Sequence, residues 1–351
     1  MKKQFILNIS RMHLMIIMMA FATITGCTKD DISSELPPSE DGSNLNFALK
    51  DNFNFSMAYA AVNNTRLNIK LAEKGPYTVF VPNNNAFSLL GIVELPRIST
   101  FYTNSQLTNL MSYCILNGKL ELKKMPLEDN KVFKTLNGGN IYVSKYLTGT
   151  DTIATVNGVR IVSLDNPAAN GQIQVVPQMM NPEVYTTVAG YLRSDTTLTL
   201  FNAAMERSGL STELLGAKDA YTVLALSNQA LQQSAKLGQN LGLSTLDSIS
   251  HADPARLAAL LKYHMVKGRY FDSDLFRLSE NGAKPVAMLN GGEIGIGGVP
   301  GGFKSITFTA TGAKGIPAQI YVPVYYSPTI INSNLPCGNG VVHIINRVLI
   351  P

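Results

Sequence analysis

The chain has 351 residues, of which 45% are hydrophobic and 15% are charged, and its 29 Lys and Arg against 24 Asp and Glu give a formal net charge of +5. The first 26 residues hold three basic side chains and no acidic ones, so the remainder carries a net charge of only +2. Proteins that bind nucleic acid need clustered Lys and Arg to displace the counterions of the phosphates. The composition therefore predicts no nucleic-acid partner, and it leaves enough apolar residues for two independent cores.

The N-terminus has the pattern of a leader for export. Lys2, Lys3 and Arg11 form a basic stretch, and an apolar run follows at residues 14–22. This run is too short for a membrane-spanning helix, which needs about 20 apolar residues, whereas the apolar region of a signal peptide needs only about 7–15. We therefore expect residues 1–26 to be a signal peptide that is removed.

The end of the leader resembles the lipobox of bacterial lipoproteins. The sequence Ile24-Thr25-Gly26-Cys27 places small residues before a cysteine, and in that class of protein the cysteine is acylated and becomes the first residue of the mature chain. Burial of acyl chains contributes about 0.8 kcal/mol per methylene, so several chains together hold a protein on a bilayer. We expect Cys27 to be the lipid anchor. The alternatives are an uncleaved anchor helix or ordinary secretion.

A polar segment follows the expected anchor. Lys29, Asp30 and Asp31 resemble the lysine-plus-acidic signal that sends some Gram-negative lipoproteins to the outer face of the outer membrane, and the resemblance implies exposure on the cell surface. The same residues are consistent with a solvated tether, because the segment is rich in Ser, Pro, Asp and Glu. We therefore assign residues 27–44 to the acylated cysteine and a flexible linker.

The rest of the chain contains one pattern twice. Residues 77–87 return 144 positions later as residues 221–231. Further matches follow in the same order, namely 107–118 with 257–268, 136–139 with 289–292, and 170–176 with 339–345. A repeat of this length indicates duplicated globular domains. The sequence predicts domain 1 at residues 45–181 and domain 2 at residues 182–351.

Both copies are expected to combine helices with strands. A helical stretch at 53–71 in domain 1 and at 198–215 in domain 2 precedes a short apolar strand, at 77–81 and 221–225. The second half of each copy contains the turn signal Asn-Gly-Gly and a closing hydrophobic strand, which is typical of a β-rich region. The predicted fold class is therefore α+β, with two domains.

One more helix is expected before each β-rich half. In domain 2, Asp253 suits the N-cap, and apolar residues recur after it with helical spacing up to His264. Cys114 holds the position of His264 in domain 1 and is expected to be a small buried residue. Gly118 and Gly268 are expected to end the two helices.

Three motifs, present in the same order in both copies, resemble the fasciclin-like domain. They are the strand-and-turn segment 77–87, the pair Tyr263-His264, and the closing segment 339–349. The resemblance extends over nearly all of residues 45–351. It implies a β-wedge of two packed sheets with helices wrapped around one side, and it implies a secreted or anchored adhesion protein.

The copies depart from the family pattern at specific positions. Domain 1 has Cys114 in place of the family's histidine and Gln174 where domain 2 has His343. In animal members the tyrosine-histidine region has been linked to receptor binding, so the resemblance implies Tyr263 and His264 as partner-binding residues. A histidine on the apolar face of a helix is also typical of a core residue that is hydrogen-bonded to the backbone. Of these two interpretations we favour the structural one.

The sequence contains no recognisable pattern for catalysis or cofactor binding. The histidines outside the leader are His251, His264 and His343, and they have no metal-ligand spacing. Cys114 and Cys337 are expected to be free thiols. The sequence therefore predicts a protein that is not an enzyme and that has no catalytic residue, no metal site and no cofactor.

The leading expectation is a lipid-anchored protein of the bacterial outer membrane, exposed on the cell surface, whose tandem domains bind a surface or extracellular-matrix protein. The alternative is a glycan-binding accessory lipoprotein of a polysaccharide uptake system. Tyr321, Tyr325 and Tyr326 favour the alternative because tyrosine rings stack on sugars, although tyrosines also fill protein cores.

Overall fold

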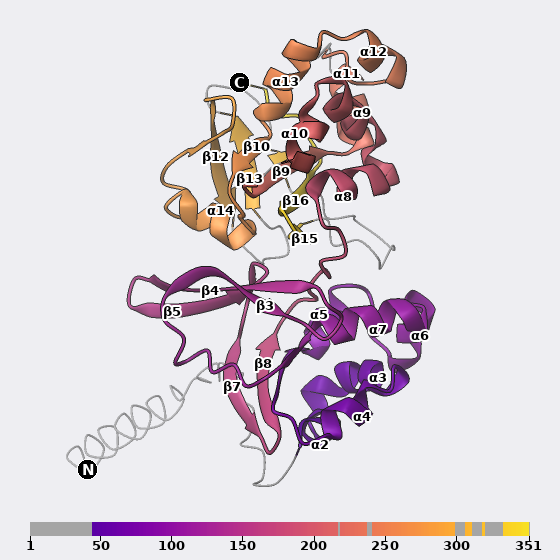
Figure 1. Cartoon of the computed structure of the whole chain (residues 1–351), viewed down its shortest axis with the longest axis vertical. Helices are drawn as coiled ribbons and strands as arrows, with labels where there is room; N and C mark the ends of the chain where they lie inside the picture. Colours follow the sequence, from indigo (N-terminus) through magenta and orange to yellow (C-terminus); the bar gives the residue numbers. More distant parts are fainter. Residues whose placement is uncertain are drawn as a thin grey trace, which may run out of the picture. The chain divides into compact units, whose positions relative to one another are not determined.

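The computed structural model describes residues 44–216, 218–236, 241–298, 306–310, 318–319 and 333–350. The elements repeat one order twice: a group of helices, a strand, further helices and a β-rich half (Figure 1). Each repeat contains two four-stranded sheets, and most of its helices gather on one side of those sheets (Figure 1). This arrangement confirms the predicted α+β class.

The helical half of domain 1 begins at Asn44, whose side chain accepts a hydrogen bond from the backbone N–H of Phe47 and so caps the first helix. A capping box of Thr103 and Gln106 starts the helix that precedes the β-rich half. The elements are α2 (Leu45–Asp51), η1 (Phe53–Phe55), α3 (Ser56–Asn64), α4 (Leu67–Ala72), α5 (Asn84–Ser88), η2 (Leu95–Arg97), α6 (Ile98–Phe101) and α7 (Asn104–Tyr113).

The first sheet of domain 1 has the order β2-β1-β8-β7. Its two central strands, β1 (Tyr77–Pro82) and β8 (Gly171–Val176), run parallel and are buried along their whole length. The outer strands β2 (Ile115–Asn117) and β7 (Ser163–Ala168) are antiparallel to them. The second sheet is an antiparallel meander of β3 (Glu128–Lys134), β4 (Asn140–Thr148), β5 (Asp151–Val156) and β6 (Val159–Arg160).

Domain 2 repeats this topology, with sheet orders β10-β9-β16-β15 and β11-β12-β13-β14. Its helices are α8 (Val188–Ser194), η3 (Thr196–Leu198), α9 (Thr199–Arg207), α10 (Leu210–Gly216), α11 (Asn228–Lys236), α12 (Leu246–His251), α13 (Pro254–Lys262) and α14 (Asp272–Leu278). Its strands are β9 (Tyr221–Leu226), β10 (Met265–Lys267), β11 (Val286–Ala287), β12 (Glu293–Gly298), β13 (Ile306–Ala310), β14 (Ala318–Gln319), β15 (Leu335–Cys337) and β16 (Gly340–Ile345). Among the residues described in both domains, no helix has the length and apolar composition that a membrane crossing requires.

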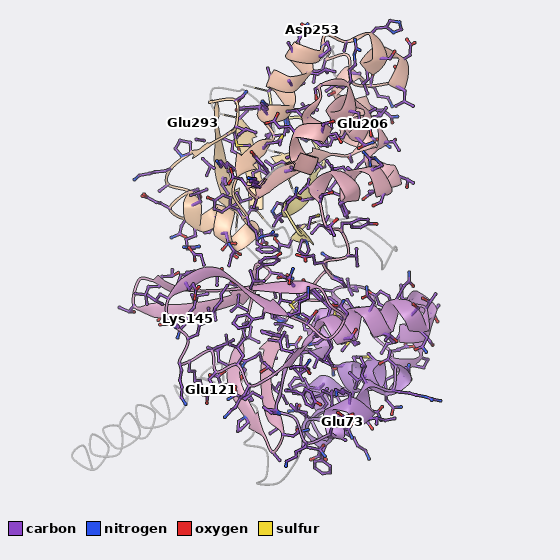
Figure 2. The ribbon with its side chains drawn as sticks, in the orientation of Figure 1. Glu73, Glu121, Lys145, Glu206, Asp253 and Glu293 are labelled. Atoms are coloured by element: carbon purple, nitrogen blue, oxygen red, sulfur yellow. The ribbon has the colours of Figure 1, made fainter. Side chains whose placement is uncertain are left out.

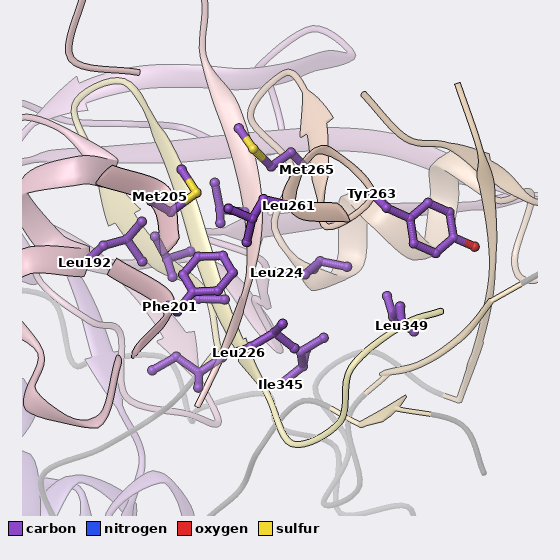
Figure 3. Close-up of a cluster of buried hydrophobic side chains, with 14 of the residues drawn as sticks. Leu192, Phe201, Met205, Leu224, Leu226, Leu261, Tyr263, Met265, Ile345 and Leu349 are labelled. Carbon is purple, nitrogen blue, oxygen red and sulfur yellow. The ribbon is translucent and has the colours of Figure 1, made fainter. Parts of the chain in front are cut away.

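Each domain has a core that its two sheets share. In domain 1, Phe80 and Val176 from the first sheet pack with Ile141 and Val156 from the second. In domain 2 the core also includes the helical residues Phe201, Met205 and Leu261, which lie close to the strand residues Leu226 and Ile345 (Figure 3). Because side chains from both sheets bury one another, each domain is a packed pair of sheets, as the family resemblance implied.

The two stretches predicted to be helical each contain a break, at Arg66 in domain 1 and at Gly209 in domain 2, because both residues adopt the left-handed backbone conformation, with φ of 62° and 79°. The expectation about the helix ends was wrong. Gly118 and Gly268 do not end helices. They follow the short strands β2 and β10, which intervene between each helix and its glycine.

One asparagine in each domain forms hydrogen bonds between segments that are far apart in the sequence. The side chain of Asn170 accepts a hydrogen bond from the N–H of Leu45 and donates to the carbonyl oxygens of Leu71 and Glu73. In domain 2, Asn339 bonds the N–H of Val188 and the carbonyl of Leu214 in the same way. We call Asn170 and Asn339 the bridging asparagines, because each links the first helices of its domain to the turn before its last strand.

Replacement of a bridging asparagine by alanine is expected to destabilise its domain by about 3 kcal/mol, because buried backbone groups lose their partners. Asn170 is only 7% exposed, so water cannot replace its side chain easily. Urea unfolding of Asn170→Ala and Asn339→Ala measures the effect. Asn104→Ala, at an exposed position, is the control. Equal stability of the bridging variants and the control would contradict the assignment.

Candidate interaction site at the tyrosine-histidine motif

The motif lies where helix α13 ends and strand β10 begins. Asp253 caps α13 with its side chain, as predicted, and Pro254 occupies the first helical position. Tyr263 is the C-cap residue, and the N–H of His264 bonds the carbonyl of Leu261. The turn therefore directs two consecutive side chains into the interior of domain 2.

Tyr263 is a buried residue, with 1% of its surface exposed. Its hydroxyl donates a 2.7 Å hydrogen bond to the carbonyl of Glu293, at the start of β12. A Cβ at Gly292 would lie 2.7 Å from the tyrosine ring, so only glycine fits beside it. Tyr113 of domain 1 makes the equivalent bond to the carbonyl of Asn140. The tyrosine thus joins the helix to the second sheet in both domains.

His264 is fully buried, and both of its ring nitrogens meet backbone groups. Nδ1 lies 3.0 Å from the carbonyl oxygen of Leu260, and Nε2 lies 3.0 Å from the N–H nitrogen of Leu349. Because a carbonyl only accepts and an N–H only donates, Nδ1 carries the proton and the ring is neutral. Burial lowers the pKa of His264 to about 4. The ring therefore fastens the C-terminal segment to helix α13.

His343 serves a similar purpose on strand β16. Its Nε2 lies 3.0 Å from the carbonyl oxygen of Tyr270, and its Nδ1 accepts a hydrogen bond from the N–H of Asn334. Burial lowers the pKa of this fully buried imidazole to about 4 as well. His343 is thus the opposite tautomer of His264, because here Nε2 carries the proton.

In domain 1, residues other than histidine contact the equivalent backbone carbonyls. Cys114 directs its thiol to the carbonyl of Leu110, at 3.4 Å, which matches the contact of His264 with Leu260. Gln174 donates to the carbonyl of Leu120, at 3.1 Å, which matches the contact of His343 with Tyr270. The fold therefore requires a side chain that satisfies these buried carbonyls, and it does not require an imidazole.

These positions decide what the motif can do. The arrangement around His264 is the one that the structural interpretation predicts, a core histidine bonded to the backbone. Neither Tyr263 nor His264 presents its ring on the surface. The pair therefore holds the domain together, and its part in binding a partner stays a prediction.

Other candidate groups do not converge. His251 is exposed, and its Nδ1 lies 3.7 Å from Asp247. Cys114 and Cys337 are buried and free, as predicted, and burial raises the pKa of each thiol to about 12. Within the described ranges, no three His, Cys, Asp or Glu side chains gather as they would around a metal ion. Cys27, Lys29, Asp30, Asp31, Tyr321, Tyr325 and Tyr326 lie outside the described residues.

Sequence reasoning missed a cluster around Arg269. All described residues belong to one compact unit, Pro38–Pro351, and within it the guanidinium of Arg269 lies 3.9 Å from the ring centre of Tyr142. The same guanidinium donates to the carbonyls of Cys337, Gly338 and Gly340. The available signal was the difference between the copies, because Lys119 stands at the position of Arg269 in domain 1.

A second group of contacts lies beside this cluster. The guanidinium of Arg277 pairs with Asp129 at 2.7 Å, and the side chain of Asn130 donates to the carbonyl of Arg269. Asn130 occupies a bulge in β3 with a φ of 51°. The bulge turns this asparagine away from the strand ladder, which no period-2 pattern in the sequence could reveal.

Comparison with known proteins identifies the fold. The model of the fasciclin domain matches residues 53–182 and 196–351. Human periostin is 24% identical over 288 residues, which cover 82% of this chain and 30% of periostin. Transforming growth factor-beta-induced protein ig-h3 of Sus scrofa is 25% identical over 286 residues, which cover 82% of this chain and 36% of that protein. The chain thus spans about a third of the length of these curated relatives.

A solved domain pair from the insect cell adhesion molecule Fasciclin I has a TM-score of 0.38 and 17% identity to this chain, and the match covers 84% of this chain and 96% of that one. The family model, by contrast, accounts for most of the chain in two segments. These segments contain both copies of the tyrosine motif, both bridging asparagines and all four sheets described above. The chain therefore belongs to the fasciclin domain family and contains two of its domains in tandem.

Proposed function

We propose that this protein is a non-catalytic, lipid-anchored surface protein whose two fasciclin domains make adhesive contacts with a protein of another surface or of a matrix. The observation that carries the proposal is the match of the family model to two segments that together span both domains. The similarity to periostin and to ig-h3 supports an adhesion-type protein. The buried hydrogen bonds of the tyrosine-histidine motif support a structural role for its polar groups.

The anchor is a part of the proposal that rests on sequence. Cys27 would carry the acyl chains, and Lys29, Asp30 and Asp31 would direct the protein to the outer face of the outer membrane. Incorporation of labelled palmitate into the wild-type chain, and its loss in Cys27→Ser, is the expected result. Equal labelling of the wild-type chain and of Cys27→Ser would contradict the proposed anchor without affecting the assignment of the domains.

Two domains on one tether favour avidity. When one weak contact forms, the linked second domain stays at a high effective concentration near the same surface, so the pair binds more tightly than either domain. We expect cells that lack this protein to attach less well to partner surfaces, and we expect Cys27→Ser cells to share the defect. Attachment that stays unchanged across a panel of cell and matrix surfaces counts against adhesion.

A binding experiment with the purified chain distinguishes the glycan-binding alternative from adhesion. It rests on Tyr321, Tyr325 and Tyr326, so it predicts that the purified chain is retarded on a specific polysaccharide in affinity electrophoresis. Retardation by one glycan, together with normal cell attachment, would replace the adhesion proposal.

A further inference from the structure

Three large apolar side chains on the first helices of domain 1 are exposed. Phe47 on α2 is 52% exposed, Phe53 on η1 is 85% exposed, and Ile69 on α4 is 62% exposed. Helix α2 packs against both η1 and α4, so the three residues come from neighbouring elements. Helices α2 and α4 lie together in Figure 1. We call Phe47, Phe53 and Ile69 the apolar triad.

The duplication shows that the fold does not need these residues to be apolar. Matching hydrogen bonds align the two domains at an offset of 143 in this region, since Asn170 bonds the N–H of Leu45 and Asn339 bonds that of Val188. At this offset the counterparts of the triad are Gly190, Thr196 and Thr212. Both threonines are exposed. Apolar side chains on neighbouring elements that water contacts and that folding does not require are typical of an interaction surface, whereas single exposed ones are common.

The net charge of this region also differs between the two copies. Residues 44–76 carry four basic and two acidic side chains, whereas the corresponding residues 187–219 carry three basic and four acidic ones. The basic residues are Lys50, Arg66, Lys70 and Lys74. Glu73, seen on this part of domain 1 in Figure 2, pairs with Lys70 at 2.7 Å. The region around the triad therefore has a net positive charge in domain 1 alone.

We propose that the apolar triad, with the basic residues around it, docks domain 1 onto an anionic lipid bilayer. Aromatic and aliphatic side chains beside Lys and Arg are the composition of surfaces that lie in the interface of a membrane, and each basic residue near an anionic surface adds to the attraction. An anionic lipid surface matches both differences between the copies, the additional apolar side chains and the additional positive charge.

The position of the triad in the chain also favours a bilayer. Helix α2 begins at Leu45, only about 18 positions after Cys27, the proposed site of acylation. The inference rests on the proposed anchoring for this argument from position and for the identity of the membrane. It adds to that function a second, weaker contact that holds the first domain against the lipid.

The absence of tryptophan from the chain allows a direct test. The probe is the chain from residue 27 onward with Cys27→Ser, so that no acyl chain contributes, together with Phe53→Trp. On vesicles of phosphatidylcholine and phosphatidylglycerol, we expect its emission to shift to shorter wavelength and to be quenched by brominated lipid. Val132→Trp, at a 55% exposed position on β3, is the matched control and is expected to keep its emission unchanged.

A binding measurement completes the test. Phe47→Ser, Phe53→Thr and Ile69→Thr together should lower partitioning onto the same vesicles by about tenfold or more, while Val132→Thr with Leu147→Thr should not. High salt and vesicles of phosphatidylcholine alone should weaken binding. Circular dichroism should show all variants folded, because every substituted side chain is exposed.

Three outcomes would overturn the inference. They are partitioning of the triad variant equal to that of the parent, emission at position 53 that does not change on vesicles, or burial of position 53 by self-association in the absence of lipid. Neither cells nor acylation enters the experiment, so its result is independent of whether the adhesion proposal or the Cys27 anchor fails.

Discussion

Alanine at Gly171 or at Gly340 is expected to unfold the affected domain or to destabilise it by about 3 kcal/mol or more. These glycines start the central strands β8 and β16, where a Cβ would overlap the carbonyl oxygens of Tyr77 and Tyr221 on the parallel neighbours. The obstructing atoms belong to the backbone of a buried strand, so they cannot move without breaking the ladder. Overpacking against atoms that cannot shift is among the costliest single changes.

Urea unfolding followed by circular dichroism measures this effect. Gly295→Ala is the matched control, because it is also a strand glycine and a Cβ there meets nothing closer than 3.7 Å. The control should stay within about 1 kcal/mol of the parent. If Gly340→Ala is as stable as Gly295→Ala, the close approach of β16 to β9 described here is wrong.

Domain 2 is expected to lose stability on acidification because of its two buried histidines. The pKa of His264 and of His343 is about 4 in the folded chain against an ordinary 6.5. Between these values the unfolded chain binds more protons than the folded chain, so stability rises with pH across the window and is lost as pH falls from 6.5 to 4. The loss at pH 4 is about 3 kcal/mol for each histidine.

A suitable control replaces the two histidines of domain 2 by the residues that domain 1 has at the same positions. His264→Cys with His343→Gln copies Cys114 and Gln174, and this variant should fold and show a stability that changes much less between about pH 7 and pH 4. Asp274, whose pKa burial raises to about 6, acts in the opposite direction, but it is present in both proteins and cancels in the comparison. Parallel stability curves for parent and variant would exclude the histidines as the cause.

Much of this architecture could be predicted from sequence, because a pattern in one copy can be checked against the matching pattern in the other. The strand at 77–81, its copy at 221–225 and the closing strands were all located within a residue or two. Local chemistry sufficed in these cases. Asparagine and aspartate caps, alternating apolar residues and Asn-Gly turns depend on neighbours in the chain, and neighbours are what a sequence displays.

The parts that could not be predicted depend on distant residues or on backbone strain. Arg66 gives no sign in its sequence that it would adopt a left-handed conformation and break a helix. The role of Asn170 is set by Leu45, which lies 125 residues away. The sequence could suggest that His264 is a core residue, but only the fold shows that Leu349 is what its second nitrogen holds. Contacts of this kind are set by tertiary structure.

The parallel pairing of β1 with β8 and of β9 with β16 affects how the chain folds. Tyr77 meets Gly171, and Tyr221 meets Gly340, so each principal sheet joins the beginning of a domain to its very end. Contacts between such remote segments make folding slow. Neither domain can therefore complete its principal sheet until its last strand has been synthesised, and a stop codon ahead of β16 would remove the middle of a sheet and not its edge.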